Sequence, residues 1–209
     1  MVREALWARA GQGEAPWLVA RNAQNDALIE RATAGDTAGV RALLAVGAEV
    51  NALDPNDQTA LLRAVRGRHE ATARALLEAG ARADLSDRQG ETAMLSAAAF
   101  DLPTLVQPLL VRGADVNGRD PAGDTPLTRV AGNDGHRHVA RTLLANGAEI
   151  DRPGAEGHTA LIRAVKRGAT AMMELLLTAG ANVELVDHEG RTALQIGRAS
   201  CRERVWRYV

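Results

Sequence analysis

Aromatic side chains are scarce in this chain, which has one phenylalanine, one tyrosine and three tryptophans among 209 residues. A globular core of that size normally uses more of these large side chains. The hydrophobic fraction is still 46%, so the chain has enough apolar side chains to form a core. Thin layers that pack on alanine and leucine need few aromatic residues. The composition therefore favours stacked layers over one large globular core.

Cysteine, lysine and long apolar runs are also nearly absent. Cys201 is the only cysteine, which excludes a disulfide framework or a thiolate metal cluster within the chain. The apolar run at 17–20 is too short for a secretory signal core, and no run reaches the length of a membrane-spanning helix. Lys166 is the only lysine, a bias typical of GC-rich genomes. We therefore expect a bacterial, cytoplasmic protein without a membrane segment, and we leave a periplasmic location open.

Gly-Ala pairs recur at nearly equal intervals and are the most regular feature of the sequence. They stand at 47–48, 80–81, 113–114, 147–148 and 180–181, so the steps are 33, 33, 34 and 33 residues. A threonine motif keeps the same rhythm and begins at Thr59, Thr92, Thr125, Thr159 and Thr192. A fixed period of about 33 residues is typical of a solenoid, in which each unit buries its apolar face against its neighbours. Such chains rarely contain a deep catalytic pocket, which favours binding over catalysis.

One repeat, residues 54–86, illustrates the local structure that we expect. A turn cluster precedes Thr59, which is well placed to cap a helix with apolar residues at 61, 64 and 65. A short break at 67–69 leads to a second helix, which Gly80 ends in the left-handed conformation. The unit is therefore a turn, a short helix, a tight loop and a longer helix. The leucines expected to fill the seams between the second helices are Leu76, Leu77, Leu109, Leu110, Leu143, Leu144, Leu175 and Leu176.

The segments 43–51 and 109–117 carry the clearest family signal, since each begins Leu-Leu, continues with Gly-Ala and an acidic residue, and ends Val-Asn. This pattern resembles the second half of the ankyrin repeat, and the resemblance covers about residues 24–194. It implies an all-α solenoid of stacked helix–turn–helix units with short turn or hairpin connections.

The chain departs from the family pattern in its hallmark residues. The hallmark proline remains only as Pro126, and the hallmark histidine is replaced by Leu62, Leu95, Thr128 and Ile162. The threonine–histidine hydrogen bonds of the family are therefore in doubt here. Pro108 falls inside the second helix of the third repeat, where it removes a backbone donor and is expected to kink the helix. The longer step comes from one extra residue within 132–135, in the loop between two helices.

We divide the chain into three parts. Residues 1–23 have no repeat register, and we expect an irregular N-terminal segment there, either a loose segment or an irregular helix. Residues 24–195 form an ankyrin repeat domain of five repeats plus the start of a sixth. Residues 196–209 abandon the repeat pattern, and 196–205 resemble one translated frame of a common sequencing adapter. We expect this tail to be non-native, with a natural basic capping helix as the alternative interpretation.

Motifs for catalysis, cofactors and metals are not found. The sequence has no nucleophile elbow, phosphate-binding loop, dinucleotide fingerprint or zinc-binding helix motif. His69 and His136 occupy a loop position where a local backbone hydrogen bond is expected, and His158 and His188 lie near turn tips, where we expect solvated side chains. The acidic residues form turns at regular intervals and do not converge as an acid–base pair. We therefore expect no enzyme activity, no cofactor and no metal.

In the ankyrin family, partners commonly meet the turn tips and the exposed side of the first helices. The resemblance maps these positions onto a basic stripe with a small apolar patch, and the predicted partner-binding residues are Arg63, Arg66, Phe100, Arg129, Arg163, Lys166 and Arg167. Phe100, the only phenylalanine, is the candidate anchor, or else it folds back over small neighbours such as Ala97. The arginines either face a partner or pair with the acidic tips, as on any solvated face.

The function that we expect is protein–protein binding by a monomer. The chain would present a rigid groove with a basic floor and an acidic rim to a partner protein that carries an acidic element. One alternative is the recognition part of a larger enzyme or effector. Another is nucleic-acid binding, which the formal net charge of -1 and the acidic rim disfavour.

Overall fold

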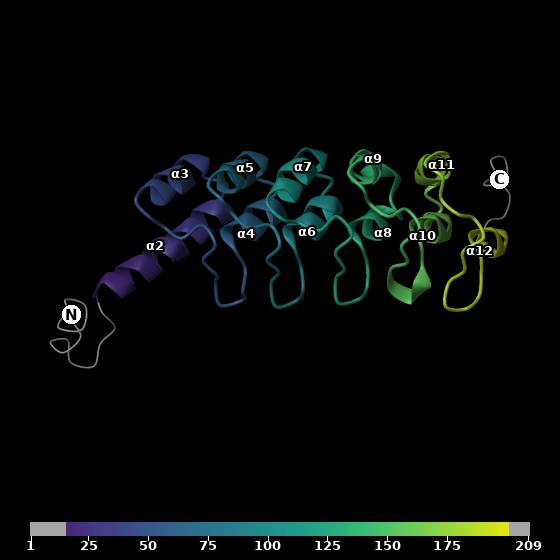
Figure 1. Ribbon diagram of the computed structural model, residues 1–209, viewed down its shortest axis with the longest axis horizontal. Coiled ribbons are helices and arrows are strands. Elements are labelled where there is room, and N and C mark those ends of the chain that lie inside the picture. The colour runs from purple at the N-terminus through teal and green to yellow at the C-terminus, as the bar shows by residue number, and fades with distance from the viewer. Residues whose placement is uncertain (1–15, 201–209) are drawn as a thin grey trace.

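The computed structural model describes residues 16–200, with side chains from residue 22 to residue 198, and forms two rows of helices (Figure 1). The inner row contains the short helices α4 (Ala60–Arg66), α6 (Ala93–Ala99), α8 (Pro126–Val130), α10 (Ala160–Arg167) and α12 (Ala193–Ser200). The outer row contains α3 (Thr37–Ala45), α5 (Glu70–Glu78), α7 (Pro103–Val111), α9 (Arg137–Ala145) and α11 (Thr170–Thr178). No β-strand occurs in the described part of the chain. The predicted all-α stack of helix–turn–helix units is therefore confirmed.

Threonine side chains cap the first turns of the inner helices, as the repeated motif predicts. The hydroxyl oxygens of Thr59, Thr92 and Thr159 each accept a hydrogen bond from the backbone N–H three residues later, at 3.1, 3.3 and 3.2 Å. Thr125 accepts from Thr128, and the hydroxyl of Thr128 accepts in return from the N–H of Thr125 at 2.8 Å. These bonds satisfy helix N–H groups that have no acceptor within the helix.

Glycine ends every outer helix because the backbone there is left-handed. Gly80 has a φ of 96°, and the N–H of Ala81 donates to the carbonyl of Leu76 at 2.9 Å. The same backbone recurs at Gly47, Gly113, Gly147 and Gly180, with φ values of 95°, 91°, 88° and 91°. Any other residue would be strained at such a φ. The regular glycines of the sequence therefore mark a backbone requirement that returns in every repeat.

Alanine and leucine form the core between the two rows. Ala64, Ala97 and Ala164 are completely buried at one repeat position of the inner helices, where a small side chain lets neighbouring helices approach closely. The completely buried leucines of the outer helices are Leu76, Leu105, Leu109, Leu143 and Leu176. This packing needs no aromatic side chain, in agreement with the composition.

The seam prediction is off by one residue in the fifth repeat. Leu176 and Leu177, rather than Leu175 and Leu176, stand at the positions that Leu76 and Leu77 hold in the second repeat, counted back from the terminal glycine. Leu175 is half-buried at the position of the buried Ala75. Leu110 and Leu144 are half-buried as well, so the second leucine of each pair packs less completely than the first.

Side-chain oxygens in the loops link three pairs of neighbouring repeats. The Oδ1 atoms of Asn51 and Asn117 accept from the backbone N–H groups of Arg82 and Glu149, both at 2.8 Å. Asp151 makes the equivalent bond farther along the stack, to a backbone N–H at 2.9 Å. Neighbouring repeats are thereby joined through a short polar side chain at a fixed position, although the hallmark histidine is missing.

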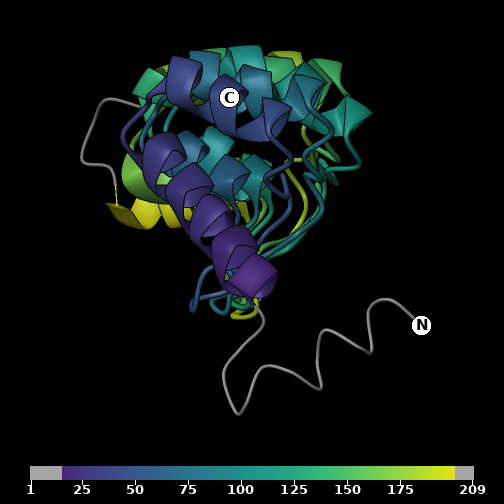
Figure 2. The same cartoon turned by 90° about the vertical axis from the view of Figure 1, so that its left-hand side faces the viewer.

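The amino-terminal end of the stack is covered by a long helix. Helix α2 (Pro16–Thr33) lies diagonally across this end of the inner row, as Figure 2 shows along the stack. It crosses the boundary predicted between residues 23 and 24, and its Leu28 and Ile29 are buried as the pattern predicts. No helix within residues 16–200 is long and apolar enough to cross a membrane.

The carboxyl-terminal end extends past the predicted limit of the repeats. Helix α12 continues beyond residue 195, and Ile196 is buried in the core. The rest of the predicted non-native tail, 201–209, lies outside the described residues, as does 1–15. The extra residue of the fourth repeat falls in a 3₁₀ turn, η1 (Asp134–His136), directly before α9. Helix α7 includes Pro108 and continues to Val111.

Candidate partner-binding surface

The exposed side chains of the inner helices and of the adjoining loop tips form one surface, called here the inner-helix face. Arg63, Arg129 and Arg163 occupy its fourth helix position in α4, α8 and α10, and Ser96 holds that position in α6. All three arginines are half-buried, whereas Ser96 is buried. The repeat therefore brings three of the seven predicted partner-binding residues into a single row.

Two arginines of α4 are bound by aspartates from the tips on either side. Nη2 of Arg63 lies 2.6 Å from Oδ2 of Asp54, and Nη1 of Arg66 lies 3.2 Å from Oδ2 of Asp87 in the next repeat. Burial would raise the pKa of Asp54, but hydrogen bonds from Arg63 and from backbone N–H groups of the same tip outweigh it and lower that pKa. Asp54 therefore stays ionised at neutral pH and orients the guanidinium.

The next two arginines of the row reach backwards to the preceding repeat. Nη1 of Arg129 donates to both carboxylate oxygens of Glu91, at 2.9 and 2.7 Å. Arg163 binds Asp124 through two nitrogens, at 2.8 and 2.7 Å. A two-point pair of this kind fixes the plane of the guanidinium as well as its position. Arg63, Arg129 and Arg163 therefore all pair with acidic residues of the tips, as the second interpretation of the sequence predicts.

Lys166 and Arg167, at the end of α10, are less constrained. Lys166 Nζ lies 3.4 Å from a carboxylate oxygen of Glu156, whose side chain is 71% exposed. A loose pair between exposed side chains contributes little free energy. Arg167 is exposed, and within the described part of the chain it makes neither an ion pair nor a hydrogen bond. Two loosely constrained cations therefore lie next to each other on the inner-helix face of the fifth repeat.

Phe100 directly follows α6 and caps its carboxyl end. Its side chain is half-buried and packs against the buried core cluster, which includes Ala97. The predicted anchor is therefore neither fully exposed nor fully covered, and part of the ring faces solvent. Phe100 stays a candidate for partner contact.

The prediction that His158 is solvated is wrong. This residue is only 4% exposed, because it stands directly before the capping threonine, at the position of the buried Gln58 in the second repeat. Its Nδ1 is 3.5 Å from a Glu156 oxygen and its Nε2 is 3.8 Å from Asp187, and neither contact is a hydrogen bond. Burial in the first place, and the positive charge of Lys166 in the second, lower the pKa of His158.

A signal in the sequence could have placed His158 correctly. The residue before the capping threonine is buried as Gln58 and half-buried as Glu91 and Asp124, so it points between repeats and not into solvent. The other histidines agree better with expectation. His69 Nε2 lies 3.0 Å from a backbone carbonyl, although that carbonyl belongs to Thr33 of the preceding repeat and is not local.

His136 and its surroundings offer no metal site. Its Nε2 lies 3.3 Å from the side-chain amide nitrogen of Asn133, a side-chain contact where a backbone hydrogen bond was expected. Within the described residues, no group of three or more histidine, cysteine, aspartate or glutamate side chains is arranged to hold a metal ion.

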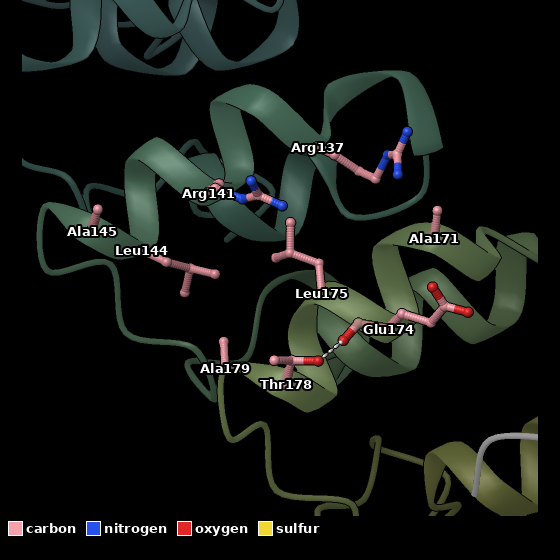
Figure 3. A pocket seen from close by; sticks show the side chains of 9 residues that line it. All are labelled: Arg137, Arg141, Leu144, Ala145, Ala171, Glu174, Leu175, Thr178 and Ala179. Carbon is pink, nitrogen blue, oxygen red and sulfur yellow. Dashed lines mark hydrogen bonds between the residues drawn. The ribbon is translucent and has the colours of Figure 1, made fainter.

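Two open hollows lie on opposite rows of the fifth repeat. The first, of about 440 Å³, lies on the inner-helix face and is lined by Ala155, Glu156, His158, Arg163, Lys166 and Arg167. The second, of about 570 Å³, lies between the outer helices α9 and α11 (Figure 3). Its floor contains Leu144 and Leu175, with Arg137 and Arg141 on one helix and Glu174 on the other. The first hollow combines a buried ring with available cations, and the second combines apolar with charged side chains.

Similar proteins share the repeat with this chain. The family model described as "Ankyrin repeats (3 copies)" matches residues 28–120, 94–187 and 127–205. A putative E3 ubiquitin-protein ligase XBAT34 of Arabidopsis thaliana is 41% identical over 68 residues, 32% of this chain and 18% of that protein. Protein fem-1 homolog A-like of Mus musculus is 42% identical over 60 residues, 29% of this chain and 9% of that protein. The matched segments therefore span less than a fifth of either relative.

The match of the family model extends over most of the chain, and it agrees with the capping threonines, the left-handed glycines and the two rows of helices. The chain belongs to the ankyrin repeat family.

Proposed function

We propose that the chain is a protein-binding module that presents the inner-helix face to a partner with an acidic element. The observation that carries this proposal is the row of Arg63, Arg129 and Arg163, each oriented by a carboxylate of a loop tip. Side chains that are ordered before binding lose less conformational freedom when a partner arrives. The row therefore supplies donors in a fixed arrangement along the stack.

The paired arginines keep donors for a partner. A guanidinium has five N–H groups, and Arg163 uses two of its nitrogens on Asp124. Its side chain is 21% exposed, so a partner oxygen can share the guanidinium from the solvent side. The pairing also reduces the net positive charge, so the row supplies orientation and specificity more than long-range attraction.

Phe100 supplies the apolar contact of the proposed interface. It lies between the arginines of α4 and those of α8 and α10 along the stack, with part of its ring facing solvent. Aromatic and arginine side chains are the residue types that most often dominate interface energies. We expect the remaining contacts to exclude water and to contribute little free energy each.

A second candidate function is the recognition part of a larger enzyme or effector. The observation that favours it is the likeness to a putative E3 ubiquitin-protein ligase, of which the matched segment is 18%. An ankyrin segment of such a protein would bind a partner while another part carries the chemistry. Nucleic-acid binding has less support, because the arginine row is already paired with carboxylates and counterion release from phosphates requires available cations.

The test is to capture a partner and then to compare its affinity for two variants, one on each face of the third repeat. Phe100→Ala removes the aromatic contact from the inner-helix face, and Val111→Ala trims a side chain that is 73% exposed at the end of α7. With the purified partner, we expect Phe100→Ala to weaken binding by about 30-fold, which corresponds to about 2 kcal/mol. Val111→Ala should bind like the wild type.

Two results would contradict the proposal. One is that both variants bind equally while the domain binds DNA or RNA with a steep dependence on salt. The other is that Phe100→Ala unfolds at a much lower temperature while its folded fraction binds normally, which would make the ring a cover for the core and not an anchor.

A further inference from the structure

The hollow on the inner-helix face of the fifth repeat is called here the repeat-five hollow. The loop tip beside it lacks a carboxylate that the other tips have. The tips of the second, third, fourth and sixth repeats begin with Asp54, Asp87, Asp120 and Asp187, and the fifth begins with Gly154. In the second repeat the tip aspartate binds Arg63 at 2.6 Å. The equivalent Arg163 has no such acceptor in its own tip and binds Asp124 of the preceding repeat.

Two cations beside the hollow are weakly paired or unpaired. Lys166, at the end of α10, has only the loose pair with the exposed Glu156 in η2 (Ala155–Gly157). The adjacent Arg167 makes no ion pair or hydrogen bond with any described residue. Both side chains line the hollow. An anion that enters it therefore meets two cations without displacing a strong ion pair.

A buried ring in the same hollow also lacks hydrogen bonds. The side chain of His158 is 6% exposed and lines the hollow. Its two ring nitrogens stay 3.5 and 3.8 Å from the nearest carboxylate oxygens, of Glu156 and Asp187. Asp187 is already bound by Arg191 at 2.9 Å. Neither ring nitrogen has a hydrogen-bond partner among the described residues, so a ligand oxygen can supply one.

We propose that the repeat-five hollow is the subsite that binds a carboxylate from the acidic element of the partner, held by Lys166, Arg167 and the protonated ring of His158. This inference rests on the proposed function, since it places the acidic element at one end of the inner-helix face. The four other predicted arginines of the face, Arg63, Arg66, Arg129 and Arg163, are already paired with tip carboxylates. A protonated imidazole donates from both nitrogens, so it adds a charge-assisted hydrogen bond to the bound oxygen.

Binding should take up a proton. The charged groups that face His158 are Lys166 and Arg163 of α10, which lower its pKa, and Glu156 of η2 and Asp187 of the next tip, which raise it. His188 packs against Gly157 beside them. A carboxylate bound in the hollow adds negative charge and raises the pKa of His158. By linkage, the affinity for an acidic ligand must then rise as the pH falls.

The experiment measures the binding of a hexaglutamate peptide to the full chain at pH 8 and pH 6, with circular dichroism at each pH to confirm folding. We expect tighter binding at pH 6, by up to about tenfold per pH unit, the limit for one proton. Arg167→Glu should weaken binding by at least about fivefold. Its control is Arg68→Glu, which makes the same charge change at an exposed position after α4.

The role of His158 is tested by replacement with the residue of the second repeat. His158→Gln should abolish the pH dependence, and His188→Gln, which removes the exposed neighbouring imidazole, should preserve it. Equal binding by Arg167→Glu and Arg68→Glu would overturn the proposal, as would a pH dependence that survives in His158→Gln.

The captured partner separates this inference from the proposed function. If Phe100→Ala weakens binding of the partner while Arg167→Glu does not, the acidic element binds outside the hollow and the proposed function stands. If the peptide binds as described but no variant of the inner-helix face affects a protein partner, the hollow stands and the proposed function fails. Competition between the peptide and the partner supports both.

Discussion

The tips of the second and fifth repeats stand at the same place in their repeats but differ in side-chain chemistry. In the second, Nε2 of Gln58 donates to Oδ2 of Asp87 at 3.0 Å. In the fifth, His158 takes the place of Gln58, and its Nε2 stays 3.8 Å from Asp187. The first contact is a hydrogen bond that joins two repeats, whereas the second is too long to be a hydrogen bond. The tips can thus differ in side-chain contacts while the helices on either side keep the same arrangement.

A second difference concerns the aspartate at the start of the tip. Asp54 binds Arg63 within the second repeat, and Gly154 removes this acceptor from the fifth. In a solenoid each repeat contacts only its neighbours, so a change in one tip leaves the distant repeats unaffected. The comparison teaches that the fold comes from features shared by all repeats, whereas a binding site can arise where one repeat deviates.

The largest expected effect tests the core that lies behind both tips. Leu109→Ala should lower the free energy of unfolding by about 2–5 kcal/mol, because this leucine is completely buried between outer helices. Leu175→Ala should cost clearly less, since Leu175 is half-buried in the hollow of the outer row. Urea unfolding monitored by circular dichroism measures both. Equal losses would mean that the register assigned to the fifth repeat is wrong.

A reciprocal exchange tests the difference between the two tips directly. Gln58→His copies the residue of the fifth repeat into the second and should cost about 1–3 kcal/mol, because the buried Asp87 loses a donor. His158→Gln copies the residue of the second repeat into the fifth and should leave stability unchanged or raise it by up to about 1 kcal/mol. Urea midpoints check both, with Gln89→His at an exposed tip position as the control. If both exchanges destabilise equally, the two tips do not differ.

The smallest effect is a pH dependence that belongs to the fifth repeat alone. The pKa of His158 is lowered from 6.5 in the folded chain, so the unfolded chain binds a proton that the folded chain does not. The stability that His158 contributes is present above the unfolded value and is lost as the pH falls below it. Between pH 7 and pH 5 the wild type should lose at most about 1.4 kcal/mol per pH unit through this group. Thermal unfolding over this range should show a flatter profile for His158→Gln.

The aspartates of the tips add a separate loss at more acidic pH. Burial raises the pKa of both Asp54 and Asp187, but hydrogen bonds outweigh it. The bonds from Arg63 to Asp54 and from Arg191 to Asp187 help to lower both pKa values below 3.8. Their contribution is present above that value and disappears only when the pH falls through the lowered range. An unchanged slope between pH 7 and pH 5 in His158→Gln would assign the dependence to another histidine and contradict the comparison.

Local signals in the sequence predicted the elements well because each depends on a few neighbouring residues. Thr59 caps its helix through a bond to Leu62, and Gly80 ends another through its own φ. The start of α2 at Pro16 was not specified by the sequence, since residues 16–23 carry no repeat pattern although they are helical. The seam in the fifth repeat was misassigned because three consecutive leucines, 175–177, allow two registers.

The sequence alone was sufficient for the period, the helical class and the family, because caps and left-handed glycines act over a few residues and return at equal steps. The partners of the arginines required the folded chain, since Arg129 and Glu91 are 38 residues apart and Arg163 and Asp124 are 39 apart. The burial of His158 also depended on the next repeat, which supplies Asp187. Charge pairing and burial arise where neighbouring repeats pack, and the physical reason is that packing depends on distances in space that spacing along the chain does not specify.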